Sequence, residues 1–341
     1  GERGRAAASC PRLSAVARGA LGVLEAPAMA DTVGYIAAEG FEAELEAELT
    51  RAGARLRGWQ GGRLLLADPP ARTPAWAEDV WYDARVLPVP SIKQAARALK
   101  GLQRNWALLT PPQHFRRASL IAQQLPHVAM KPLAFPERPP TAPLGGWTLL
   151  DAQRMLASPA TLSPFPHGRA QFVEDRENPP NRAYLKLWEA LSLTEVRPGP
   201  GDRCLDLGAA PGGWTWVLAS LGASVTAVDK AGLAANVAAL PGVQMRRDSA
   251  FALDPGRDGP VDWLCSDVVC YPDRLYRLVT RWLQAGAARN FVCTVKFQGE
   301  TDTAAMDAFA ALPGSRLMHL HHNKHELTWV SLDRWRQASK A

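Results

Sequence analysis

A glycine-rich turn directly after a short apolar strand constrains this sequence more than any other feature. The strand is expected over residues 203–208, and the turn continues as Ala209-Ala210-Pro211-Gly212-Gly213-Trp214. Glycine lets the backbone turn sharply and approach a ligand closely, as in the first strand–helix turn of nucleotide-binding folds. The dinucleotide pattern G-x-G-x-x-G is absent, because Ala210 stands where its second glycine belongs. A nicotinamide-dependent oxidoreductase is therefore disfavoured.

Two acidic residues follow the turn in the order that a nucleoside site needs. Asp229 ends the next expected strand, 21 residues after Gly208, where a carboxylate can accept hydrogen bonds from a ribose diol. Asp248 follows a third short strand, where its side chain is expected to meet an adenine amino group. The turn and the two acids together predict a site for an adenosyl cofactor. A glycine turn needed only for packing is the weaker alternative.

Strands and helices alternate from about residue 182 towards the end of the chain. Helices are expected over 184–193 and 214–221, and apolar strands over 203–208, 223–229, 261–266 and 290–295. Apolar strands separated by helices form a parallel sheet that is covered on both faces. We therefore expect an α/β domain of Rossmann-like type over residues 151–341.

Residues 29–150 follow a different order. A strand, an acidic helix and a second strand are expected over 33–67, then a strand over 79–88 and a basic helix from about 92 to 104. This order indicates a small α+β module of ferredoxin-like type. Closely spaced prolines exclude a regular element after it and indicate a linker: Pro132, Pro136, Pro139, Pro140 and Pro143. Residues 1–28 lack the apolar run of a secretory signal, and we interpret them as a leader or a mis-assigned start before Met29.

The positive charge of the chain is concentrated in one stretch. Lysine and arginine number 39 against 33 acids, a formal net charge of +6. Between residues 90 and 140 the only acid is Glu137, and the bases are Lys93, Arg97, Lys100, Arg104, Arg116, Arg117, Lys131 and Arg138. Such a surface attracts a phosphate backbone through counterion release, although a solvated helix face is the alternative. We interpret the stretch as RNA-docking.

Apolar runs, cysteines and histidines limit the other possibilities. The sequence contains no run of about 18 apolar residues, so we expect no membrane span. Five cysteines without CxxC spacing indicate buried thiols in a reducing, cytoplasmic compartment. Four histidines crowd before Glu326, but alternate residues of a strand point to opposite faces, so we expect no metal site: His319, His321, His322 and His325.

Two further segments carry a resemblance to a known family. The turn Gly212-Gly213-Trp214-Thr215 and the stretch from Ser163-Pro164-Phe165 to Arg182-Ala183-Tyr184-Leu185-Lys186-Leu187 resemble the RlmM family of FtsJ-type ribose 2′-O-methyltransferases. That family uses S-adenosyl-L-methionine to methylate a cytidine ribose of bacterial 23S ribosomal RNA. The resemblance covers residues 160–332 and, more weakly, 33–85. Over 90–150 the family's THUMP RNA-binding domain looks reduced and rewritten.

The resemblance implies a site made of two residue sets. The catalytic Lys–Asp–Lys–Glu set maps onto Lys186, Asp267, Lys296 and Glu326. In it, Lys296 takes the ribose proton while the two acids fix the ammonium groups. The residues expected to bind S-adenosyl-L-methionine are Gly208, Ala210, Pro211, Gly212, Gly213, Trp214, Asp229, Asp248 and Asp267.

Absent motifs separate this reaction from related ones. Enzymes that methylate amino groups carry Asp/Asn-Pro-Pro-aromatic after the fourth strand, where this chain has Ser266-Asp267-Val268-Val269. Cys265 lies within an apolar strand and does not stand as a nucleophile for base methylation. We predict an RNA ribose 2′-O-methyltransferase that acts on ribosomal RNA. The alternatives are a non-catalytic RNA-binding ribosome-assembly factor, a methyltransferase of another RNA such as tRNA, and a small-molecule O-methyltransferase.

Overall fold

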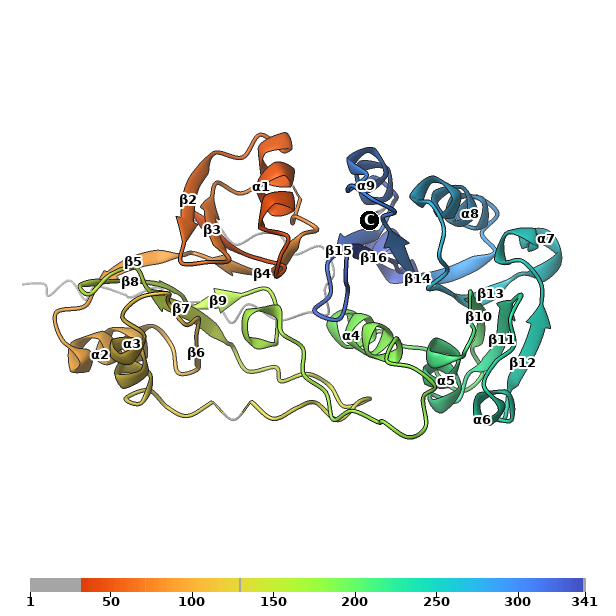
Figure 1. Cartoon of the computed structure of the whole chain (residues 1–341), viewed down its shortest axis with the longest axis horizontal. Coiled ribbons are helices and arrows are strands. Elements are labelled where there is room, and N and C mark those ends of the chain that lie inside the picture. Colours follow the sequence, from red (N-terminus) through yellow and green to blue (C-terminus); the bar gives the residue numbers. More distant parts are fainter. Residues whose placement is uncertain (1–31, 71, 129, 340–341) are drawn as a thin grey trace, which may run out of the picture.

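A computed structural model describes residues 32–70, 72–128 and 130–339 of the chain. The leader that we expect over residues 1–28 lies outside the described residues. Three sheets organise the described part, with two small N-terminal sheets at one end of an elongated molecule and a larger sheet at the other (Figure 1).

The first sheet is antiparallel and has the order β2-β3-β1-β4-β9. Its first four strands have the ferredoxin-like order, and helix α1 (Glu42–Arg51) connects β1 to β2. The sequence analysis missed β2, and the basic helix that it assigns to this module from about 92 to 104 packs on the second sheet instead. Prolines 69, 70 and 74 occupy the link where the second helix of that motif would stand, and its described residues form none. The strands are β1 (Val33–Ala37), β2 (Leu56–Gln60), β3 (Leu64–Ala67), β4 (Ala77–Tyr82) and β9 (Ala160–Thr161).

The single strand expected over 79–88 is wrong, because the chain turns in its middle. Asp83 adopts the left-handed conformation, with φ of 52°, and pairs its carboxylate with Arg85. The chain leaves the first sheet at this point, and β5 (Arg85–Pro88) enters a second one. A short acidic residue tolerates positive φ better than most, and this is why the turn falls at Asp83.

The second sheet has the order β5-β8-β7-β6 and packs against helices α2 and α3. Leu99, Trp106 and Trp147 lie at the centre of its core. The domain boundary that we place between residues 150 and 151 falls inside its β7–β8 hairpin, so the N-terminal sheets extend to Thr161. The elements are α2 (Ile92–Leu102), β6 (Trp106–Leu108), α3 (Phe115–Ala122), β7 (Gly145–Leu149) and β8 (Arg154–Ser158).

The third sheet confirms the Rossmann-like α/β domain. Its order is β12-β11-β10-β13-β14-β16-β15. The strands of this sheet are parallel except β16, which runs antiparallel to its neighbours β14 and β15. With the strands numbered from the first of this domain, the order is 3-2-1-4-5-7-6, with the switch point beside β10. The strands are β10 (Arg203–Leu207), β11 (Ser224–Asp229), β12 (Val243–Arg247), β13 (Val261–Ser266), β14 (Ala288–Lys296), β15 (Ser315–Met318) and β16 (Glu326–Ser331).

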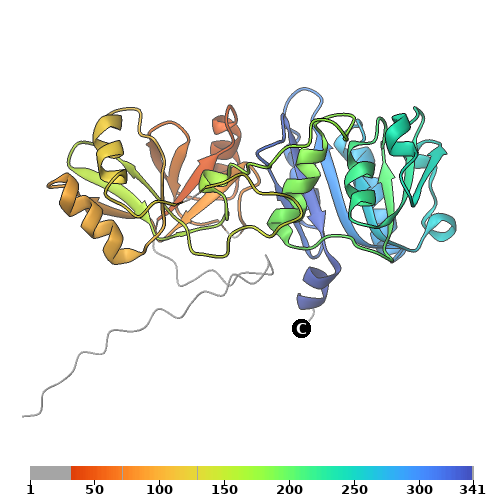
Figure 2. The ribbon, with the colours of Figure 1, turned by 90° about the horizontal axis from the view of Figure 1, so that it is seen from below.

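Helices cover both faces of this sheet. Figure 2 shows α4 and α5 on one face, where they form one core cluster with Trp263 and Val292, and α8 and α9 lie on the other. The helices are α4 (Tyr184–Thr194), α5 (Gly213–Ser220), α6 (Ala235–Ala238), α7 (Pro255–Asp258), α8 (Pro272–Gln284), α9 (Thr303–Ala310) and α10 (Asp333–Ala338), with short 3-10 turns at Pro166–Gly168 and Ala250–Ala252. Among the described residues, no helix combines the length and the apolarity needed to cross a bilayer.

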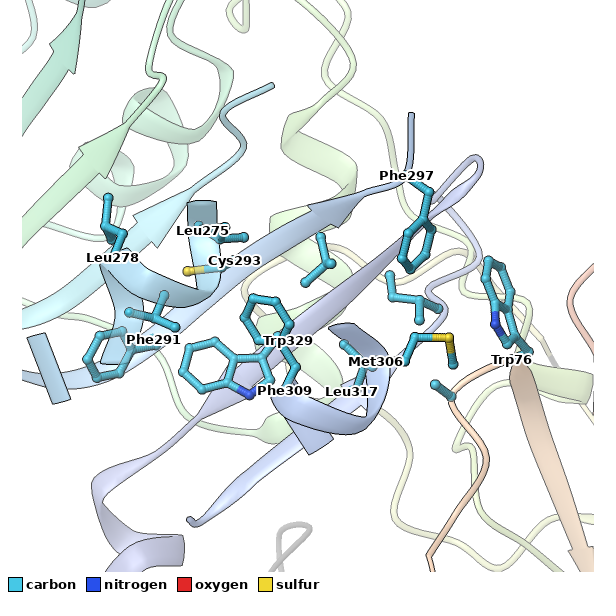
Figure 3. Close-up of a cluster of buried hydrophobic side chains, with 14 of the residues drawn as sticks. Trp76, Leu275, Leu278, Phe291, Cys293, Phe297, Met306, Phe309, Leu317 and Trp329 are labelled. Carbon is cyan, nitrogen blue, oxygen red and sulfur yellow. The ribbon is translucent and has the colours of Figure 1, made fainter. Parts of the chain in front are cut away.

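One apolar core joins the first sheet to the Rossmann-like domain. Trp76, which precedes β4, lies beside Phe297, Met306 and Leu317 (Figure 3). Its ring centroid is 6.1 Å from that of Phe297. The backbone N–H of His319 donates to the carbonyl of Ala75 at 2.6 Å. The ferredoxin-like sheet is therefore docked against the strands that end at the site described below.

We expect Asp79→Asn to flatten the dependence of stability on pH. Asp79 is fully buried in β4, accepts from Ser163 N at 2.8 Å, and burial raises its pKa to about 8. Between roughly pH 4 and pH 8 the folded chain keeps a proton there that the unfolded chain loses. The free energy of unfolding therefore falls as pH rises through this range, and the neutral amide removes this dependence. Denaturant titrations across that range measure it.

The exposed Asp273 supplies the control, since Asp273→Asn should give a pH profile parallel to that of the wild type. A parallel profile for Asp79→Asn as well would contradict the role given to Asp79.

Candidate active site

The carboxyl ends of three neighbouring parallel strands meet at one edge of the third sheet. Gly208 follows β10, Asp267 follows β13, and Lys296 is the last residue of β14. Strand β16 runs the other way, so its first residue, Glu326, begins at this same edge and pairs directly with Lys296. Ligands of open α/β sheets bind at such an edge, next to the point where the strand order reverses.

The structure brings all four residues of the expected Lys–Asp–Lys–Glu set together. Lys186 Nζ lies 2.7 Å from Asp267 Oδ1 and 3.1 Å from Glu326 Oε1. Lys296 Nζ lies 3.2 Å from Asp267 Oδ1 and donates to the Asp267 carbonyl at 2.5 Å. The four side chains are only 10% to 17% exposed. They come from helix α4, two parallel strands and one antiparallel strand.

The four groups form a charge-balanced cluster in which the two lysines are held by different numbers of carboxylates. Two ammonium groups face two carboxylates in a mostly buried place, where an unpaired charge is costly. Lys186 has two carboxylate partners, whereas Lys296 shares one oxygen of Asp267 with it. Lys186 is therefore the anchored cation, and Lys296 is the one placed to exchange a partner or a proton.

The glycine turn lies directly against the segment that carries Asp267. Gly208 has φ of +75°, and a Cβ there would stand 2.7 Å from Val268 Cα. The Gly208 and Ala209 N–H groups both donate to the Val228 carbonyl. Gly212, with φ of +119°, precedes α5 and gives it no side-chain cap. The turn thus needs glycine both for its conformation and for its closeness to the segment that carries Asp267.

Asp229 and Asp248 stand at the ends of neighbouring strands, as the sequence predicts, but with different partners. Asp229 accepts from the N–H groups of Ala210 and Ala231, at 3.0 and 2.9 Å. Asp248 binds the Arg246 guanidinium, with Nη2 at 2.8 Å, which lowers the pKa of its carboxyl. Arg246 is a partner that the sequence analysis missed. Asp229 therefore borders the turn itself, whereas Asp248 lies in a partly buried ion pair beside it.

Trp214 does not present its ring to the turn. The ring is buried in the core beneath α4 and α5, and its Nε1 donates to the Ala183 carbonyl at 2.9 Å. Gly213 is packed so closely that a Cβ would lie 2.3 Å from Asn181 Oδ1. Only the backbone of these two residues can therefore contact a ligand. The Trp214 ring and the close packing at Gly213 hold the turn against the start of α4.

Asp206 is a buried acid of the site that the sequence analysis missed. It lies within β10 below the turn and accepts from Thr215 Oγ1 at 2.6 Å. Burial, followed by the nearby Asp267 and Asp229 charges, raises its pKa to about 7. Its signal was present in the sequence, because an acid inside the apolar run Cys204-Leu205-Asp206-Leu207 needs a buried polar partner.

The four histidines before Glu326 contact three different residues of other elements. His319 and His321 approach Glu78, His322 contacts Glu189, and His325 lies 2.9 Å from Thr301 Oγ1. The described residues contain no group of three or more His, Cys, Asp or Glu placed to hold a metal ion. The histidine segment therefore connects protein elements to one another.

Comparison with known proteins finds a family match that covers Lys186, Asp267 and Lys296 and ends before Glu326. Residues 179–306 match the model of the FtsJ-like methyltransferases. A "Ribosomal RNA large subunit methyltransferase M" of Halorhodospira halophila is 42% identical over 160 residues, which cover 44% of this chain and 46% of that protein. The protein of the same name from Alkalilimnicola ehrlichii is 36% identical over 197 residues, or 54% of this chain and 53% of its own.

A third relative matches over a greater length. The "Ribosomal RNA large subunit methyltransferase M" of Xanthomonas oryzae pv. oryzae is 28% identical over 343 residues, which cover 86% of this chain and 97% of that protein. The first two matches span about half the length of those relatives. The stronger identity is thus confined to about half of the chain, and the match that covers 86% of the chain has the lower identity of 28%.

We expect Gly208→Ala to weaken binding of S-adenosylmethionine at least about tenfold. The added Cβ cannot be accommodated 2.7 Å from Val268 Cα, and the positive φ strains any residue other than glycine. Isothermal titration calorimetry measures the affinity. Gly199→Ala is the control, because its φ is ordinary and nothing lies within 4 Å of the new atom. Equal affinities of the two variants would exclude the turn from the cofactor site.

Proposed function

We propose that this chain, which carries an FtsJ-like methyltransferase domain, transfers a methyl group from S-adenosylmethionine to a ribose 2′-hydroxyl of RNA. The observation that carries the proposal is the convergence of Lys186, Asp267, Lys296 and Glu326 within hydrogen-bonding distance at the carboxyl edge of the sheet. No other reaction class considered for this sequence needs two lysines and two acids in one buried cluster.

The residues beside the cluster fit the cofactor. The turn from Gly208 to Gly213 leaves no room for a side chain at Gly208, as expected where backbone approaches a ligand. Asp229 lies at the end of β11 with its carboxylate at the turn, where a ribose diol would bind. Asp248 would face the adenine from the next strand. When bound, S-adenosylmethionine supplies an electrophilic methyl group.

Proton removal is the work of the lysines and acids. A ribose hydroxyl is a poor nucleophile, so its proton must leave as the bond from O2′ to carbon forms. Lys296 Nζ accepts that proton after its own ammonium proton has passed to solvent. Lys186 remains charged between Asp267 and Glu326 and holds both acids in place. The products are the 2′-O-methyl ribose, S-adenosylhomocysteine and a proton that Lys296 returns to solvent.

We expect Lys296→Ala to lower the rate of methyl transfer roughly 10²–10⁴-fold, the usual contribution of a positioned proton acceptor. The affinity for S-adenosylmethionine should stay within about twofold of the wild type, because the turn and Asp229 are untouched. The assay follows labelled methyl from the cofactor into 2′-O-methyl nucleosides of unmodified ribosomal RNA.

Lys324→Ala is the matched control, since the side chain of Lys324 is exposed. The substitution keeps the contacts of its carbonyl, with His319 Nε2 at 3.0 Å and Glu326 N at 2.9 Å. Full activity of Lys296→Ala would remove Lys296 from the mechanism. If the wild type binds cofactor but transfers nothing to ribosomal RNA, tRNA or assembled particles, a non-catalytic RNA-binding assembly factor becomes the better interpretation.

The second sheet supports an RNA substrate. Lys93, Arg97 and Lys100 follow one another at helical spacing on α2, and all three are exposed. Within the described part of the chain no acid pairs with them, and Arg116 on the neighbouring α3 is exposed as well. We call Lys93, Arg97 and Lys100 the basic stripe. An unpaired basic stripe is suited to bind phosphates without reading sequence.

We extend the proposal to large-subunit ribosomal RNA, with a cytidine of 23S RNA as the target. The resemblance of the turn and of the segment before Lys186 supports this target, as do the names of the relatives. We also propose a cytoplasmic location, which the four free and buried cysteines of the described residues fit.

We expect replacement of the basic stripe by alanine to weaken RNA binding and to reduce its salt dependence. Each lost phosphate contact should lower the slope of log K against log salt by roughly one unit. Fluorescence anisotropy with ribosomal RNA fragments at several salt concentrations measures the slope. Arg257→Ala, on an exposed arginine already paired with Asp258, should leave the slope unchanged. An unchanged slope in the triple variant would place RNA docking elsewhere.

A further inference from the structure

The loop between β15 and β16 decides where Glu326 stands. It runs over residues 319–325 and leads straight into Glu326, the first residue of β16. The pairing of Glu326 with Lys296 fixes its distance along the sheet. Its approach to Lys186, which lies on a helix above the sheet, depends on how the loop is held.

A buried carboxylate holds this loop to helix α4. Glu189 Oε1 accepts from His321 N at 2.7 Å, and Oε2 accepts from His322 N at 3.1 Å. The His322 ring adds a contact of 2.6 Å from Nδ1 to Oε2. Glu189 is 1% exposed. All its contacts named here end on two consecutive residues of the loop, five and four residues before Glu326.

Glu189 and Lys186 lie one helical turn apart on α4. Residues three apart occupy the same side of a helix. Helix α4 therefore binds residues 321–326 at two points. Glu189 accepts from His321 and His322, and Lys186 donates to Glu326. A rigid helix that holds both points sets the distance between them.

Packing alone does not account for an acid at this position. A fully buried carboxylate costs several kcal/mol unless it is well bonded, and an apolar residue of similar size would fill the core more cheaply. The neighbours of Glu189 on α4 are apolar and belong to the core: Leu185, Leu187, Trp188, Ala190 and Leu191. The carboxylate is matched to the two loop N–H groups, which no apolar side chain could bind.

We propose that Glu189 is a positioning residue that clamps the loop 319–325 to α4 and thereby sets the Lys186–Glu326 contact. Through that contact it fixes the ammonium group that orients Asp267. The proposal rests on the function proposed above for its effect on rate. Its effect on the loop itself does not depend on the substrate.

Hydrogen–deuterium exchange of the loop tests the clamp directly. In Glu189→Gln one of the two accepting oxygens becomes an N–H₂ donor, which cannot accept from the loop, so we expect at least one of the His321 and His322 amides to exchange at least about tenfold faster. Exchange in α5 should stay as in the wild type. Glu195→Gln is the matched control, because Glu195 is exposed at the end of the same helix. Unchanged exchange at both amides of Glu189→Gln overturns the proposal, whatever the substrate is.

Kinetics test whether the clamp acts through Glu326. We expect Glu189→Gln to lower kcat roughly 10- to 100-fold, with KM values for cofactor and RNA within about twofold, as for a small misplacement of a reacting group. Adding Glu189→Gln to Glu326→Gln should then cost less than about threefold more. Multiplied losses in the double variant would mean an independent structural role and contradict the proposal.

Two further results keep the outcomes distinct. If Glu189→Gln fails to fold, Glu189→Asp takes its place, since the acid is kept but its reach is shortened by one methylene. If the wild type methylates RNA and the folded Glu189 variants match its kcat, the proposal fails while the proposed function stands. If the wild type methylates nothing, the proposed function fails and loop exchange alone decides the clamp.

Discussion

The Asp267 carboxylate binds two ammonium groups at one point of the sheet edge, and the site depends on this shared contact. Its Oδ1 lies 2.7 Å from Lys186 Nζ and 3.2 Å from Lys296 Nζ. Two cations so close repel each other unless negative charge lies between them. Glu326 adds the second negative charge, and removal of any one member would leave an uncompensated charge in a mostly buried place. The four residues therefore act as a unit.

Topology explains why these residues meet. Parallel strands present their carboxyl ends to one edge, which brings Gly208, Asp267 and Lys296 together although they are far apart in the sequence. If the last acid came from another parallel strand, it could reach this edge only from the end of that strand. Because β16 is antiparallel, its first residue can occupy the same edge, and the loop before it becomes part of the site.

The N-terminal sheets are joined to this edge and are not a separate appendage. Trp76 and Phe41 stack near His325, and Trp76 also packs near Phe297. These two partners are the immediate neighbours of Glu326 and Lys296 in the sequence. The first sheet is thereby built into the core that supports Lys296 and Glu326, and its orientation relative to them is fixed by apolar packing.

The sequence by itself determined the first five strands of the Rossmann-like domain, its helices α4 and α5, the glycine turn and the acid at Asp229, because local periodicity and backbone demands are written in consecutive residues. It did not predict β15, β16, α8 or α9. The resemblance supplied the identity of the four catalytic candidates. Only the tertiary structure decided that Asp83 ends a strand and that Asp248 faces Arg246. It also placed the Glu189 carboxylate of α4 against the loop before Glu326. Each of these depends on partners brought close by folding from other parts of the chain, and spacing along the sequence does not encode such distances.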